Sequence, residues 1–187
     1  MSTIYLDMDG VLVDFFGGIE LKYGVDHWKS IQDREIKFLE LHNTDFFHTL
    51  PIFREDRGPR RAGASISCEI HRHVKSVAEK NGMSWGICTS PLRGDRDNSA
   101  YWKRRWLEDK RYMPDLVENL IITSNKHKYA WNKLTRRPNI LIDDKLENIK
   151  RWNDAGGIGI RFQTNEDDLE EYLFVELEKA IERSRNP

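Results

Sequence analysis

Five short runs of apolar residues are spaced along the chain, and each has the length of one buried strand. They cover residues 3–6, 83–88, 120–122, 139–142 and 157–162. In the segments between them, apolar positions recur every three or four residues, which is typical of amphipathic helices. Apolar strands that alternate with helices predict an α/β fold in which a parallel sheet is covered on both faces.

Three predicted helices follow from this spacing. The segment 64–80 has apolar residues on one face, and Asn81-Gly82 after it is a typical stop signal. A second helix carries Leu146, Ile149 and Trp152 and is expected to end at the glycine pair 156–157. The acidic segment 166–182 keeps leucines at helical spacing, and we expect it to pack on the sheet as a closing helix.

Residues 7–63 interrupt the alternation, because they contain no clear strand. Helical patterns cover residues 16–23 and 33–41, and Phe46-Phe47 precedes a connector rich in Pro and Arg at residues 51–61. A structureless loop of this length is uncommon inside a compact domain. We therefore expect a small helical cap, residues 15–63, inserted after the first strand into a core formed by residues 1–14 and 64–187.

Polar groups follow four of the predicted strands. Asp7 and Asp9 follow the first, Thr89-Ser90 the second, Lys126 the third and Asp143-Asp144 the fourth. Taken alone, the first pair is also compatible with an ordinary acidic turn. Because parallel strands end at one edge of a sheet, where ligands bind, the four groups are expected to converge. Carboxylates crowded in this way repel one another unless a divalent cation neutralises them, and Mg²⁺ prefers such oxygen ligands.

These motifs, in this order, resemble those of the haloacid dehalogenase (HAD) phosphatase superfamily. The stretches Asp-Met-Asp-Gly-Val-Leu-Val-Asp-Phe (7–15), Ile-Cys-Thr-Ser-Pro (87–91) and Leu-Ile-Asp-Asp-Lys (141–145) are similar to one branch of it, the 5'(3')-deoxyribonucleotidases. The pairs Phe46-Phe47 and Leu50-Pro51 resemble the segment with which that family leaves its cap. The resemblance implies a three-layer, Rossmann-like parallel sheet with a small helical cap.

The resemblance also assigns roles to individual residues. It implies that Asp7 is the nucleophile that forms an aspartyl-phosphate, and that Asp9 is the acid and base. Thr89 and Ser90 would contact the phosphoryl oxygens, and Lys126 would offset negative charge, with Lys128 as an alternative. Mg²⁺ would be held by Asp7, the backbone carbonyl of Asp9, Asp144 directly and Asp143 through a water. In the cap, Phe15 and Phe38 would line a pocket for the base; for Phe15, packing of the first cap helix is an equal alternative.

Composition and charge limit the partners. The 187 residues carry 30 basic and 31 acidic side chains, so no net field attracts nucleic acid. The sequence has no apolar run long enough for a membrane span and no room for a signal peptide before the first strand. Cys68 and Cys88 lack metal-site spacing, which favours a cytoplasmic location. A small-molecule nucleotide is the expected partner, and the oligomeric state, a homodimer included, is left open.

Together, these features predict a Mg²⁺-dependent phosphatase that hydrolyses (deoxy)nucleoside monophosphates. The alternatives are a phosphatase of nucleic-acid 3' or 5' ends, for which the basic clusters 54–61 and 93–105 would contact the backbone, and a non-catalytic binding protein on the same scaffold.

The tryptophans of the segment 101–106 and three of the histidines are expected to have structural roles. Trp102 and Trp106 are expected to form an apolar stripe, with the basic residues between them turned outward. His71 and His73 are expected on different helix faces, which disfavours a metal pair, and His127 is expected at the surface.

Overall fold

The computed structural model describes residues 1–53 and 65–185. Its centre is a parallel sheet with the strand order β3-β2-β1-β6-β7. The strands are β1 Thr3–Leu6, β2 Ser84–Thr89, β3 Leu120–Ile122, β6 Ile140–Asp143 and β7 Ile158–Arg161. All five expected strands are therefore present, with bounds that agree to within one residue. The predicted α/β fold with a parallel sheet is confirmed.

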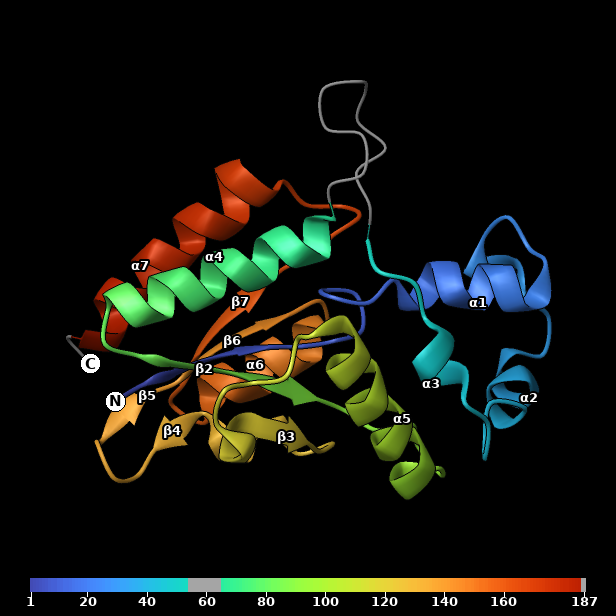
Figure 1. Cartoon of the computed structure of the whole chain (residues 1–187), viewed down its shortest axis with the longest axis horizontal. Helices are drawn as coiled ribbons and strands as arrows, with labels where there is room; N and C mark the ends of the chain where they lie inside the picture. Colours follow the sequence, from blue (N-terminus) through green and yellow to red (C-terminus); the bar gives the residue numbers. More distant parts are fainter. Residues whose placement is uncertain (54–64, 186–187) are drawn as a thin grey trace.

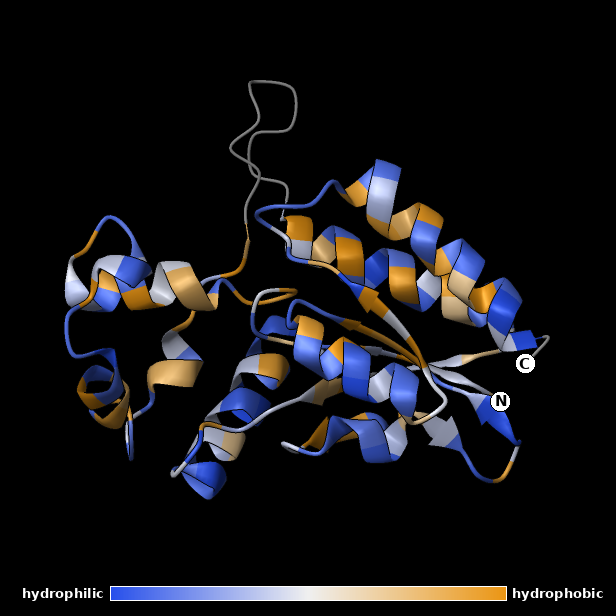
Figure 2. Cartoon of the chain, turned by 180° about the vertical axis from the view of Figure 1, so that it is seen from behind, coloured by the Kyte–Doolittle hydropathy of each residue, from blue (hydrophilic) through white to orange (hydrophobic). Residues whose placement is uncertain are grey.

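Helices cover both faces of this sheet, which makes three layers (Figure 1). On one face lie α4 (Ile66–Lys80) and α7 (Val175–Arg185), and on the other lies α6 (Leu146–Asp154). The side chains of β1 alternate accordingly, because Ile4 and Leu6 join the larger apolar cluster and Tyr5 joins the smaller one beside Trp152. Polar and apolar residues alternate along these helices, as expected for elements with one buried face (Figure 2).

The helix ends differ slightly from those expected. Ser65 begins α4, and its side chain accepts a hydrogen bond from the backbone N–H of Cys68. The expected first residue, Ala64, lies outside the described residues. Helix α6 ends at Asp154, before the glycine pair. The expected closing helix consists of a π-helical segment, η4 (Leu169–Phe174), that continues into α7.

The segment expected to form a cap contains α1 (Phe15–Tyr23), η1 (Trp28–Ser30), α2 (Arg34–Leu39) and α3 (Phe46–Thr49). The three α-helices lie together beyond the carboxyl ends of the strands (Figure 1). The expected helix over 33–41 is thus shorter, and α3 was not expected as a helix. The expected boundary at residues 63 and 64 and the basic cluster 54–61 lie outside the described residues.

The remaining elements connect the strands. Helix α5 (Arg96–Lys110) packs against α3, and the short helices η2 (Val117–Asn119) and η3 (Lys126–Tyr129) flank β3. The strands β4 (Trp131–Asn132) and β5 (Arg137–Pro138) form a small antiparallel pair that was not expected. Within the described ranges, no helix combines the length and apolar character that crossing a membrane requires.

Candidate active site

The turn after β1 places the first acidic pair. The Met8 carbonyl accepts hydrogen bonds from the backbone N–H groups of Val11, Leu12 and Val13, which fold the chain sharply back. Gly10 lies in this turn with φ of 80°, a conformation that favours glycine. A Cβ atom at Gly10 would lie 2.6 Å from Cγ of Asp144. The Asp-x-Asp-Gly motif therefore needs its glycine both for the turn and for the approach of the second acidic pair.

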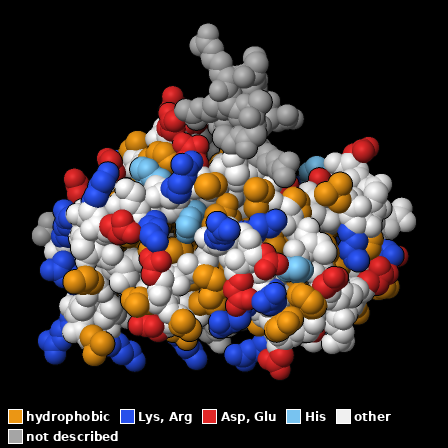
Figure 3. All heavy atoms as spheres, in the orientation of Figure 1, with side chains coloured by type: hydrophobic (Ala, Val, Ile, Leu, Met, Phe, Trp, Pro, Cys, Tyr) orange, Lys and Arg blue, Asp and Glu red, His pale blue; other side chains and the backbone are white. Residues whose placement is uncertain are grey.

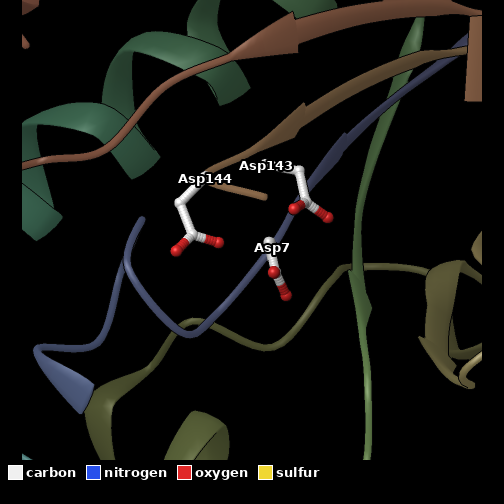
Figure 4. Close-up of side chains that lie close together, drawn as sticks. All are labelled: Asp7, Asp143 and Asp144. Atoms are coloured by element: carbon white, nitrogen blue, oxygen red, sulfur yellow. The ribbon is translucent and has the colours of Figure 1, made fainter. Parts of the chain in front are cut away.

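Three carboxylates converge at this edge of the sheet (Figure 4). Asp7 follows β1, and Asp143 and Asp144 stand at the end of β6; one ligand oxygen of each lies within 4.8 Å of the others. Lys126 Nζ lies 2.8 Å from Oδ2 of Asp7 and 2.6 Å from Oδ2 of Asp143. The structure thus brings four of the predicted site residues together. Lys128, the alternative to Lys126, is exposed.

The charges in this cluster do not balance. Burial, the Asp7 carboxylate and the Asp143 carboxylate together raise the pKa of Asp144 to about 8. Burial and Asp7 also raise the pKa of Asp143 to about 6. Burial alone would lower the pKa of Lys126, but the adjacent Asp7 and Asp143 carboxylates outweigh this and raise it. Lys126 carries one positive charge against three carboxyl groups, so ionising all three would leave two negative charges without a partner, and in the metal-free protein Asp144 keeps its proton near neutral pH.

These donors fit a hard divalent cation. Asp143 is already engaged, because Asn148 Nδ2 and the backbone N–H of Lys145 donate to its carboxylate in addition to Lys126. No described residue donates a hydrogen bond to the Asp144 carboxylate, which lines an adjoining cavity. An all-oxygen cluster with two surplus negative charges matches the ligand preference and the charge of Mg²⁺.

Asp9 has a partner that the sequence interpretation missed. Lys103 Nζ, from α5, lies 2.5 Å from Oδ2 of Asp9 and 3.1 Å from Oγ1 of Thr89. The Lys103 side chain is completely buried, so the expectation that it turns outward was wrong. Burial and Asp7 raise the pKa of Asp9, and Lys103 opposes both effects. The Asp9 side chain is not part of the three-carboxylate cluster.

The buried face of α5 explains this error. It contains Ser99, Lys103, Trp106 and Leu107, whereas Trp102 is half-buried and Arg104 and Arg105 are exposed. Ser99, Lys103 and Trp106 follow the spacing i, i+4, i+7, and this was the signal that could have identified Lys103.

A cavity of about 470 Å³ opens beside these groups. Its walls come from the turn after β1, the first cap helix, the ends of β2 and β3, and α6: Asp7, Asp9, Phe15, Ser90, Ser124, Asp144, Lys145, Glu147, Asn148 and Arg151. Thr89 is fully buried behind this wall, and Ser90 Oγ donates to the Thr123 carbonyl over 3.3 Å. A volume of this size suits a small organic ligand.

Phe15 and Phe38 occupy different positions. Phe15 lines the cavity and also packs against Phe47, with stacked rings whose centroids are 6.2 Å apart. Phe38 lies 6.3 Å from Phe15, measured between ring centroids, but is not among the cavity-lining residues. Phe15 therefore lies both in the cavity wall and in the aromatic packing, while Phe38 does not line the cavity; whether Phe15 stacks on a base stays a prediction.

The histidines lie apart from the carboxylate cluster. The ring of His71 packs against Trp85 and Tyr112, and the ring of His73 stacks on Phe174. His127 lies 3.0 Å from Arg151, between Nδ1 and a guanidinium nitrogen. None of the three belongs to a group of metal-ligating side chains in the described part of the chain.

The similarity of this chain to known proteins is found among solved structures. No protein-family model matches the sequence, and no curated protein matches it. Among similar solved structures is a hydrolase from Pseudomonas syringae, which shares 15% sequence identity with this chain. The similarity covers 96% of this chain and 89% of the hydrolase, with a TM-score of 0.45.

Proposed function

We propose that this protein is a Mg²⁺-dependent HAD-type phosphatase that hydrolyses (deoxy)nucleoside monophosphates to a nucleoside and phosphate. The observation that carries the proposal is the convergence of Asp7, Asp143 and Asp144 around Lys126, with Asp9 two residues from the nucleophile. A buried cluster of three carboxyl groups around one lysine has no structural purpose of its own, because carboxylates held a few ångströms apart repel one another and oppose folding.

The metal would be held by Asp7, Asp144 and the backbone carbonyl of Asp9. Asp143 would bind through a water, in keeping with the three protein groups that already donate to its carboxylate. When bound, Mg²⁺ would cancel the charge that otherwise repels a phosphate dianion from Asp7.

The proposed reaction has two steps. A carboxylate oxygen of Asp7 attacks phosphorus, the bond from phosphorus to the ester oxygen breaks, and Asp9 gives its proton to the leaving alkoxide. In the second step, Asp9 takes a proton from a water that attacks the aspartyl-phosphate, and phosphate leaves with Asp7 restored. Lys126 holds Asp7 in place through its 2.8 Å contact and offsets charge at the phosphoryl group. Ser90, which lines the cavity, contacts a phosphoryl oxygen.

The cavity supports a small substrate. Its volume suits one nucleotide, and the Phe15 ring in its wall offers a stacking surface for a base. The surface gives less support to an enzyme of nucleic-acid ends, because basic and acidic side chains are interspersed on the face in Figure 3 and Lys103 is buried. A non-catalytic binding protein has no need for an acid–base residue such as Asp9 beside the carboxylate cluster.

The test is phosphate release from a panel of deoxy- and ribonucleotides, sugar phosphates and phosphorylated oligonucleotides, with Mg²⁺ and with chelator. We expect Mg²⁺-dependent turnover of nucleoside monophosphates and a far lower rate on oligonucleotide ends. Asp7→Asn keeps the shape of the side chain but removes the nucleophile, so turnover should fall by several orders of magnitude. Turnover in excess chelator, or more than a few per cent of activity in Asp7→Asn, would refute the mechanism, and equal rates on DNA ends would refute the substrate class.

A further inference from the structure

Lys103 is a fully buried lysine that the proposed reaction does not yet use. Its side chain has no solvent exposure, and its ammonium group meets three groups: Oδ2 of Asp9 at 2.5 Å, Oγ1 of Thr89 at 3.1 Å and the face of the Phe47 ring, whose centroid is 4.9 Å away. Burying an ammonium group is costly unless the surrounding groups compensate it. A buried lysine shared by two residues of one site therefore indicates a role in that site.

The contacts of Lys103 fix how its two polar partners are oriented. An ammonium group only donates hydrogen bonds, so the Thr89 oxygen must accept from it, and the Thr89 hydroxyl hydrogen is left for another acceptor. At Asp9, the ammonium group occupies Oδ2. The other oxygen, Oδ1, is buried and has no hydrogen-bond partner among the described residues. The Lys103 contact therefore favours Oδ1 as the oxygen that carries a proton on Asp9.

We propose that Lys103 is a positioning residue that holds the Asp9 carboxyl in the orientation needed for proton transfer, with the Thr89 hydroxyl as the second anchor of its ammonium group. This inference rests on the proposed function, because it takes Asp9 as the acid and base. The contacts of Lys103 with charged groups in the described part of the chain do not include Asp7, so Lys103 acts through Asp9.

The surroundings of Lys103 make it a rigid support. Helix α5 is fixed near the cap, because Trp106 Nε1 donates to the Leu50 carbonyl over 2.8 Å in a buried contact. Phe47, which lies over the ammonium group, also stacks on Phe15 in the cavity wall. The orientation of Asp9 thus depends on side chains from both the core and the cap, and a rigid supporting residue is what a precise catalytic geometry requires.

The first test compares Lys103→Met with wild type on two substrates. Met keeps the length of the side chain without the donor group, and Arg104→Met, an exposed change on the same helix, is the matched control. The ratio kcat/KM reports the steps up to departure of the leaving group, which needs a proton from Asp9 for a nucleoside but scarcely for p-nitrophenol. We expect kcat/KM to fall about 100-fold or more for a nucleoside monophosphate and only a few-fold for p-nitrophenyl phosphate, with no change in Arg104→Met.

The second test asks whether Lys103 acts through Asp9. In an Asp9→Asn background, Lys103→Met should lower the nucleotide kcat/KM by no more than a few-fold, because the group it positions is already gone. Equal losses on both substrates, or multiplicative losses in the double variant, would overturn the proposal.

A readout without turnover separates this inference from the proposed function. The melting temperatures of the two single variants and the double variant form a thermodynamic cycle for the pair. Each single change leaves a buried charge without its partner, so the double variant should lose less than the sum of the two single losses. If wild type hydrolyses none of the phosphate esters, the proposed function fails and the positioning role with it. If wild type is active but the melting losses add, only the Lys103 proposal fails.

Discussion

Replacing Asp144 by Asn tests the charge imbalance that underlies the proposed metal site. In the metal-free protein, the pKa of Asp144 is raised from 3.8 to about 8, chiefly by burial and by Asp7. One pKa unit corresponds to about 1.4 kcal/mol. Keeping Asp144 in its folded surroundings at pH 7 therefore lowers the free energy of unfolding by about 4 kcal/mol before screening by solvent is included. Water in the adjoining cavity screens part of this, and we expect Asp144→Asn to raise the free energy of unfolding by about 2 kcal/mol. For a chain of this size, that is an increase of about 4–8 °C in melting temperature.

The sign of the pH dependence follows from proton binding. Between pH 4 and pH 8 the folded metal-free protein holds a proton on Asp144 that the unfolded chain has released. The stability of wild type should therefore fall as pH rises through this window, by up to about 1.4 kcal/mol per pH unit from this group. Below pH 6, Asp143 adds a similar contribution, since its pKa is raised to about 6. Asp144→Asn removes the Asp144 contribution, so its advantage over wild type should grow from pH 5 to pH 8.

The assay is urea unfolding in chelator at pH 5, 6, 7 and 8, repeated at pH 7 with increasing Mg²⁺. Asp154→Asn, an exposed change at the end of α6, is the matched control and should follow wild type. Mg²⁺ at 100 times its dissociation constant should stabilise wild type by about 2.7 kcal/mol, and Asp144→Asn by much less, because a direct ligand is lost. If Asp144→Asn shows the same pH slope and the same Mg²⁺ response as wild type, Asp144 is neither strained by its neighbours nor a metal ligand.

Two further predictions concern other parts of the molecule. Phe15→Ala should lower kcat/KM for nucleotides about 5- to 150-fold, because stacking a base on an aromatic ring contributes about 1–3 kcal/mol. The same change should barely alter the hydrolysis of p-nitrophenyl phosphate. A uniform loss on both substrates would leave Phe15 with its packing role alone. Burial and Lys75 lower the pKa of His71, so as pH falls the unfolded chain protonates this histidine before the folded protein does. Wild type should therefore lose stability as pH falls below about 6.5. In urea unfolding at about pH 7.5 and about pH 5.5, His71→Gln should show a smaller loss of stability, and an identical loss would contradict the assignment.

The sequence predicted the sheet edge well because each strand that carries a motif is a nearly continuous apolar run followed at once by polar groups. Asp7, Asp143 and Lys126 could be placed together from parallel topology alone, since that topology requires only that strand ends share one edge. The approach of Asp7 to Asp143 then follows from the pairing of β1 with β6, whereas Lys126 reaches both carboxylates from beyond β3, two strands away from β1.

The parts that could not be predicted depend on how helices rotate and how loops pack. In α5, Trp106 is at helical spacing with both Trp102 and Lys103, and the spacing of Lys103 with Ser99 is a weaker signal than an apolar pair, so the tryptophan pair was preferred. Helix α3 is a four-residue element whose local signal is too short to read. Phe38 was expected in the pocket wall. The tertiary packing of α2 on Phe15, which the sequence pattern does not reveal, places Phe38 behind Phe15 instead.

The two chain passes that link the cap helices to the sheet lie directly against each other. Val13 pairs with Ile52 in an antiparallel bridge, and the backbone N–H of Asp14 donates to the Pro51 carbonyl over 2.9 Å. A segment whose ends meet in this way adds almost nothing to the path of the main chain through the core. In the proposed enzyme, the segment between Asp14 and Pro51 is therefore a module that could be lengthened, shortened or exchanged while the sheet keeps its connectivity. Substrate choice could then diverge as long as the contacts of Phe47 and Leu50 with α5 are kept.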